Sequence, residues 1–180
     1  LLLLTASSVS AQTQVTVGTP VVSSGNSEAS PVNIFYENLR YQAVYTAAEL
    51  SSTGLSANAT IEALGWDVTE VPGHALKNYA IRMGHTTNAN SSTHIATGLT
   101  QVYTSTSYVP NLGFDMLTFS TPFTWNGTDN IVIDVCFGTN DGWDSTGTLN
   151  LYNIVANQCR HIFDFTTSMC SNSTTSANSG

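Results

Sequence analysis

The sequence predicts an all-β fold in which two antiparallel sheets pack face to face, as a β-sandwich or jelly roll, with at most one short helix near residues 46–50. Three observations predict it. Apolar residues recur with a period of about two rather than about 3.6, the apolar stretches are short, and Gly, Pro, Asn and Ser separate them. A series of about eight or more such strands is typical of a two-sheet sandwich.

Residues 130–137 form the strongest expected strand. Every second residue from Ile131 to Phe137 is apolar, which predicts one face turned toward the core. Asp134 and Cys136 lie on the opposite face of the same strand. A strand with this pattern belongs in the middle of a sheet.

The other expected elements are bounded by turn-forming residues. In chain order the remaining strands are 14–17, 40–46, 60–69, 79–83, 99–104, 114–119, 148–155 and 160–165. Thr46 followed by Glu49 has the spacing of a capping box and predicts the short helix. We expect Trp66 in the core and Trp125 in the turn that precedes residue 130.

The two ends of the chain differ from its middle. Four leucines, a tract of small residues and then Val9-Ser10-Ala11 are typical of a secretory signal peptide cut between Ala11 and Gln12. We therefore expect residues 1–11 to be the remnant of an N-terminally truncated signal peptide and 12–170 to be a single β-sandwich domain. Residues 171–180 are rich in Ser, Thr and Asn and predict a linker to a further C-terminal region. The expected location is extracellular or at the cell surface.

The charge balance argues against several partners. The chain has 4 Lys and Arg against 12 Asp and Glu, a net charge of −8. Nucleic acids and anionic membrane surfaces require clustered Lys and Arg, so we expect neither. After signal cleavage no apolar run has the roughly 20 residues that a membrane span needs.

Export would allow a disulfide among the three cysteines, Cys136, Cys159 and Cys170. Cys136 points away from the inner face of its strand, so a later segment can cover it. We therefore prefer the pair Cys136–Cys170, which would tie the end of the domain to the central strand. Cys136–Cys159 is the competing pair.

No catalytic signature is found in the sequence. A G-x-S-x-G nucleophile turn is lacking, and none of the four histidines has a second histidine two or four residues away. Glu62 and Asp67 share an expected strand, but alternation places them on opposite faces, so they do not form a carboxylate pair. The prediction is a chain without catalytic residues or an organic cofactor.

One loop concentrates groups that could bind a ligand: Asn140, Asp141, Trp143 and Asp144. Carboxylate and carbonyl oxygens suit a structural Ca²⁺ ion held by Asp141 and Asp144. A tryptophan flanked by hydrogen-bonding groups suits a sugar. The simpler interpretation is an acidic turn whose Trp143 packs on the edge of the sheet.

Several segments resemble an N-terminal β-sandwich module of Bacteroidota extracellular proteins. They are residues 40–50, 78–87, 98–103, 121–130 and 131–137, in this order. Proteins of this group are commonly multidomain and are exported by the type IX secretion route. The resemblance implies an adhesin-like or accessory role beside other domains of the same polypeptide.

The sequence thus predicts a non-catalytic extracellular module that binds a glycan or a protein through its loops, or that spaces neighbouring domains. The alternative is an accessory domain, or a part, of a secreted peptidase or glycoside hydrolase.

Overall fold

The computed structural model of the chain describes residues 13–23, 25, 29–138, 141, 144–152 and 158–172. The expected signal remnant 1–11, the cleavage point between Ala11 and Gln12, and residues 173–180 of the expected linker lie outside the described residues. Asn140 and Trp143 also lie outside them.

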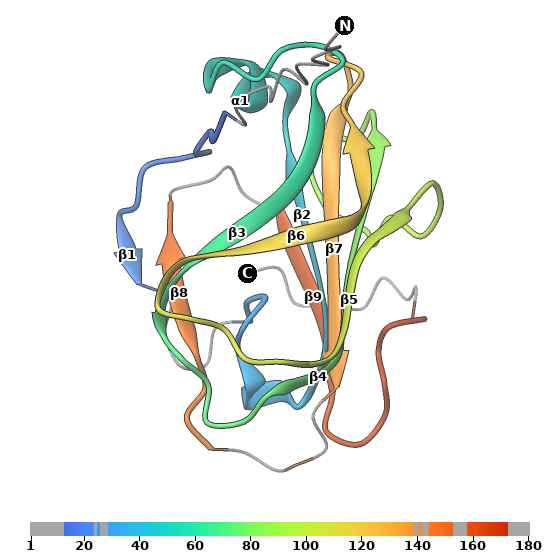
Figure 1. The fold of residues 1–180 in the computed structure, drawn as a ribbon. Helices are drawn as coiled ribbons and strands as arrows, with labels where there is room; N and C mark the ends of the chain where they lie inside the picture. The colour runs from blue at the N-terminus through green and yellow to red at the C-terminus, as the bar shows by residue number, and fades with distance from the viewer. Residues whose placement is uncertain are drawn as a thin grey trace, which may run out of the picture.

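The described residues form two antiparallel sheets that pack as a sandwich, as the sequence predicts (Figure 1). The four-stranded sheet has the order β1 (Val22–Ser23), β8 (Thr148–Leu151), β3 (Thr60–Glu70) and β6 (Gly113–Thr124). The five-stranded sheet has the order β5 (Thr100–Tyr108), β4 (Leu76–Thr86), β7 (Asn130–Gly138), β2 (Asn38–Tyr45) and β9 (Cys159–Asp164). In Figure 1, β3 and β6 cross in front of the five-stranded sheet.

Most neighbouring strands come from distant parts of the chain. Among the described strands, only β4 and β5 are consecutive in sequence and adjacent in one sheet. The central strand β7 lies between β4 and β2, which both precede it by tens of residues. Side chains that meet on the outside of this sheet are therefore far apart in the sequence.

The short helix forms where the capping-box spacing predicts it. Helix α1 (Ala47–Ser52) has Thr46 as its N-cap. The Thr46 hydroxyl accepts a hydrogen bond from the Glu49 backbone N–H, and the Glu49 carboxylate accepts one from the Thr46 backbone N–H. This reciprocal pair satisfies two amide groups that the first helical turn leaves without partners. A single 3₁₀ turn, η1 (Ile34–Tyr36), precedes β2.

The core lies between the two sheets and uses the alternating apolar residues of both. Tyr79, Ile81 and Met83 of β4 are buried, and so are Ile131, Val135 and Phe137 of β7, whereas Ile133 is half-buried. Trp125 is 1 % exposed and its indole N–H donates to the Asp129 carbonyl, which closes the turn before β7. Trp66 is half-buried and packs against the core.

Two strand predictions are corrected. Residues 14–17 form no strand, and β1 occupies residues 22–23 instead, where it pairs with β8. Strand β6 extends beyond the predicted residue 119 to Thr124 and contains Pro122. Proline cannot donate a ladder hydrogen bond, and Pro122 falls within an irregularity of the β3–β6 register on an edge strand, where such a bond is not required.

Candidate ligand-binding site

A row of polar side chains crosses the outer face of the five-stranded sheet, the face turned away from the four-stranded sheet. The ladder registers place one residue of each strand in this polar row, namely Arg160, Gln42, Asp134, Arg82 and Gln101. Alternation explains the placement, because these residues occupy the positions between the core-facing residues of their strands. An outer face that carries both charges and amides differs from the apolar inner face of the same strands.

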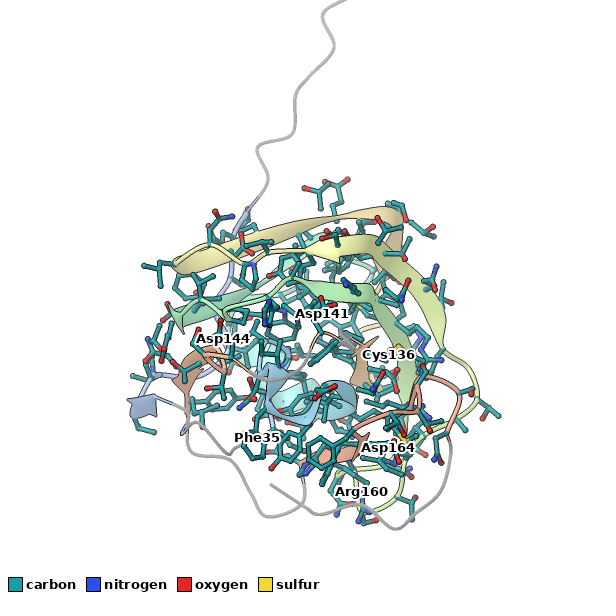
Figure 2. The ribbon with its side chains drawn as sticks, turned by 90° about the horizontal axis from the view of Figure 1, so that it is seen from below. Phe35, Cys136, Asp141, Asp144, Arg160 and Asp164 are labelled. Carbon is teal, nitrogen blue, oxygen red and sulfur yellow. A yellow bond between two sulfur atoms is a disulfide. The ribbon has the colours of Figure 1, made fainter. Side chains whose placement is uncertain are left out.

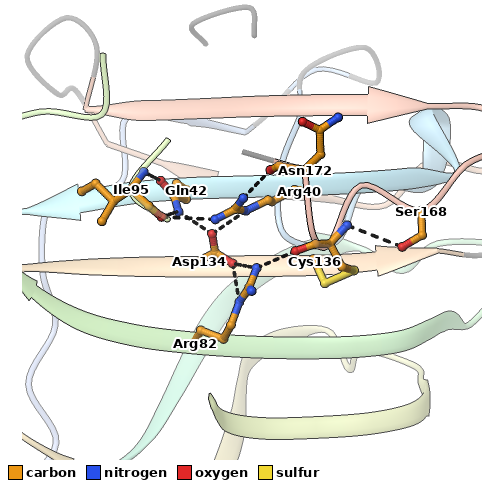
Figure 3. Close-up of polar contacts among 9 residues, drawn as sticks. Arg40, Gln42, Arg82, Ile95, Asp134, Cys136, Ser168 and Asn172 are labelled. Atoms are coloured by element: carbon orange, nitrogen blue, oxygen red, sulfur yellow. Dashed lines mark hydrogen bonds and ion pairs between the residues drawn. A yellow bond between two sulfur atoms is a disulfide. The ribbon is translucent and has the colours of Figure 1, made fainter. Parts of the chain in front are cut away.

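Asp134 is the centre of the polar row and is completely buried. Its Oδ2 accepts hydrogen bonds from Arg40 Nε at 2.8 Å and from the side-chain amide of Gln42. Its Oδ1 accepts from Arg82 Nε at 2.9 Å and from Arg82 Nη2 (Figure 3). A buried carboxylate is tolerated only when it is paired and hydrogen-bonded, and here both oxygens are saturated.

The β4–β5 connection is held against this face by the same residues. The Ile95 carbonyl accepts from Gln42 Nε2 at 2.7 Å and from Arg40 Nη2 at 3.2 Å. The side-chain Oε1 of Gln42 accepts in return from the Ile95 backbone N–H. Arg160 Nε donates to the Ser91 carbonyl at 2.7 Å. The outer face near β2 and β9 is therefore covered by residues of this connection.

The C-terminal segment is attached to the same outer face by residues of β2, β4 and β7. Arg82 Nη2 donates to the Cys170 carbonyl at 3.0 Å, and Arg40 Nη1 donates to the Asn172 carbonyl. Cys170 also forms a disulfide with Cys136 of β7, with a Cα–Cα distance of 5.3 Å. One covalent bond and two charge-assisted hydrogen bonds thus hold this segment on the sheet.

The disulfide is the pair preferred from the sequence, and the sheet explains why the competing pair does not form. Cys136 lies on the outer face beside Arg40 and Ala80. Cys159 is paired in register with Ala43, on the core-facing side of β2, and remains a free thiol. The two sulfur atoms are therefore on opposite faces of one sheet.

A groove of about 270 Å³ lies on the outer face over β4 and β5, beside the disulfide. Its floor includes Ala80 and the Cys136–Cys170 bridge. Amides and hydroxyls line most of the remainder, from Asn78, Gln101, Thr104, Ser105 and Thr106. Arg82, whose side chain is 26 % exposed, supplies the charged group. The groove therefore offers hydrogen-bonding groups to solvent beside a disulfide cross-link.

The loop favoured by the sequence lies elsewhere and is only partly described. Asp141 accepts from the Lys77 ammonium group, and Asp144 Oδ1 accepts from the Ser145 backbone N–H at 2.8 Å. The Asp144 carboxyl group also packs against Gly73. Asp144 and Cys136 lie toward opposite sides of the molecule in Figure 2. The two carboxylates thus have separate partners. Asn140 and Trp143, the other expected ligand-binding residues of this loop, lie outside the described residues.

The described part of the chain holds neither a cluster of metal-ligating side chains nor a membrane-spanning helix. No three His, Cys, Asp or Glu side chains there converge on a point that could hold a metal ion. No helix in that part has the length and apolar character needed to cross a membrane.

Sequence reasoning did not identify the polar row as a site. One signal was present, because Asp134 is the only charged residue in the apolar stretch 131–137, and a charge in such a strand requires a buried partner. Its partners could not be named, since Arg40 and Arg82 reach it only through the order of β2, β7 and β4 in the sheet.

Comparison of the chain with protein-family models, with curated proteins and with solved structures found no match.

Proposed function

We propose that this chain is a non-catalytic binding module of an exported bacterial protein and that it binds a glycan in the groove over β4 and β5. The observation that carries the proposal is the lining of that groove. Side-chain amides of Asn78 and Gln101 and hydroxyls of Thr104 and Thr106 are exposed along it. Amides and hydroxyls both donate and accept, which suits the hydroxyl groups of a sugar.

The rigidity of the surroundings supports binding. Strand β4 pairs with β7 on one side and with β5 on the other, and Arg82 is held in place by two hydrogen bonds to Asp134 and one to the Cys170 carbonyl. A ligand that meets groups already fixed in position loses less of its binding free energy to their ordering.

Binding rather than chemistry is proposed because of the kind of groups that the groove presents. Its lining consists of amides, hydroxyls, one guanidinium group and a disulfide. The carboxylate that contacts Arg82, that of Asp134, is completely buried and is paired with both Arg40 and Arg82. A group in that position is suited to hold Arg82 rather than to transfer protons to a ligand.

Export is the second part of the proposal. The Cys136–Cys170 disulfide supports it, since stable disulfides are mainly found in oxidising compartments. The resemblance of residues 40–50, 78–87 and 121–137 to modules of Bacteroidota surface proteins also supports it. We propose an adhesin-like or accessory role beside further domains of the same polypeptide.

A glycan array probed with residues 12–180 tests the binding site. We expect at least one glycan to bind, and the double variant Gln101→Ala/Thr104→Ala to lose most of that signal because two exposed lining side chains are removed. Thr118→Ala is the matched control, since Thr118 is also an exposed strand residue but lies on β6 of the other sheet.

Two outcomes would contradict the proposal. The absence of any bound glycan would reject glycan binding. Binding that survives the double variant but is lost in Trp143→Ala would place the ligand at the loop of residues 140–144 instead of the groove.

A further inference from the structure

We infer that the ligand of this groove carries a carboxylate, as in a uronic or sialic acid residue, and that Arg82 binds the carboxylate through Nη1. The inference rests on the proposed function and adds the chemical class of the glycan.

The charges around Asp134 do not cancel. Arg40 and Arg82 both pair with this one carboxylate, so one positive charge of the three groups remains uncompensated. Among the described residues that line the groove there is no Asp or Glu. The groove is therefore locally cationic in a chain whose net charge is −8.

The remaining charge can be reached only through Arg82. All three side-chain nitrogens of Arg40 donate to protein oxygens, those of Asp134, Asn172 and Ile95, and its side chain is 3 % exposed. Arg82 uses Nε and Nη2 for Asp134 and Cys170. Its Nη1 makes no hydrogen bond within the described part of the chain, and the side chain lines the groove.

A carboxylate is the ligand group that fits this arrangement. It carries one negative charge, which balances the single residual positive charge, and it accepts the charge-assisted hydrogen bond that Nη1 can donate. Gln101 lies directly opposite Arg82 in the β4–β5 ladder, so its amide can reach the same part of a ligand. The hydroxyls of Thr104 and Thr106 then extend along the groove toward the neutral part of a saccharide.

The experiment measures binding of two acidic probes and their neutral counterparts to residues 12–180. The probes are tri-galacturonic acid with its methyl ester, and sialyllactose with lactose. We expect at least one acid to bind at least about tenfold more tightly than its counterpart, and this difference to shrink as salt is added.

A negative charge placed beside Arg82 Nη1 tests whether Arg82 binds the carboxylate of the ligand. Gln101→Glu is nearly isosteric, lies at an exposed position and leaves the Asp134 hydrogen bonds untouched. It should weaken binding of the acid about tenfold or more and thereby remove most of the acid's advantage over its neutral counterpart. Thr118→Glu adds the same charge on the other sheet and should change neither affinity.

The outcomes separate this inference from the proposed function. One outcome is that neutral probes bind as tightly as the acids and lose their binding in Gln101→Ala/Thr104→Ala. That result would contradict the carboxylate requirement but would agree with glycan binding in the groove. Equal weakening of the acid by Gln101→Glu and Thr118→Glu would also overturn the carboxylate requirement, because the charge at Arg82 would then have no special role. If no array glycan and no probe binds, both proposals fail.

Discussion

Arg82 and Asp134 face one another across the β4–β7 ladder, and both Nε and Nη2 of Arg82 donate to the same carboxylate oxygen, Oδ1. Arg40 approaches Oδ2 from β2 on the other side. One buried carboxylate thereby joins three strands. The two arginines that it holds also donate to the carbonyls of Asn172 and Cys170, and these bonds position the C-terminal segment beside the groove.

Removal of the charge of Asp134 should strongly destabilise the fold. In Asp134→Asn two arginines remain without a buried counter-charge, and the loss of one partner of a buried pair costs about 3–5 kcal/mol. Urea denaturation measures the change. Asp141→Asn is the control, because the Lys77–Asp141 pair is exposed and should contribute less than about 1 kcal/mol. Equal costs for the two variants would show that Asp134 has no special structural role.

The disulfide should contribute to stability chiefly by restricting the unfolded chain. Cys136 and Cys170 are separated by 34 residues. For a loop of that size the loss of the cross-link in Cys136→Ala/Cys170→Ala should cost about 3–4 kcal/mol in the free energy of unfolding. Peptide mapping without reductant should find these two cysteines linked. A linked peptide containing Cys159 would contradict the assignment.

Cys159 should react slowly with alkylating agents in the folded protein. Burial raises the pKa of its thiol, the hydrogen bond donated by Tyr41 opposes the rise, and Glu49 adds to it. Because the thiolate is the reactive species, iodoacetamide near neutral pH should label Cys159 much faster in urea than in buffer. Mass spectrometry of timed samples measures both rates, and similar rates in the two conditions would refute the prediction.

His161 should make the fold less stable in mild acid. Burial lowers the pKa of His161 from its ordinary value of 6.5, and His94 and Arg160 act in the same direction. As the pH falls below about 6.5, the unfolded chain takes up a proton that the folded chain does not, so the free energy of unfolding decreases. In His161→Phe, whose ring can pack against Tyr36 and Phe163, this part of the decrease should disappear. Urea denaturation of both proteins at several pH values between about 8 and about 5 measures this difference. If the free energy of unfolding falls equally with pH in both proteins, His161 is not the source of the decrease.

Local patterns in the sequence predicted most of the fold. Alternation located the central strands, and the Thr46–Glu49 spacing located the helix, because both depend on residues close together in the chain. The strand expected at residues 14–17 was wrong, since alternation cannot tell whether a partner strand is present. The outward position of Cys136 favoured Cys170 as its disulfide partner, and the structure confirms this pair. Cys159 is not the partner because it lies on the opposite face of the sheet from Cys136.

The sequence by itself determined which residues of each strand face the core and which face outward, because side chains alternate along any strand. Only the tertiary structure decided which outward residues meet. Gln42, Asp134, Arg82 and Gln101 form one row because the sheet order is β2, β7, β4 and β5, and this order depends on pairings between distant segments. The candidate site therefore arises from strand order, which packing of the two sheets selects and which no local pattern specifies.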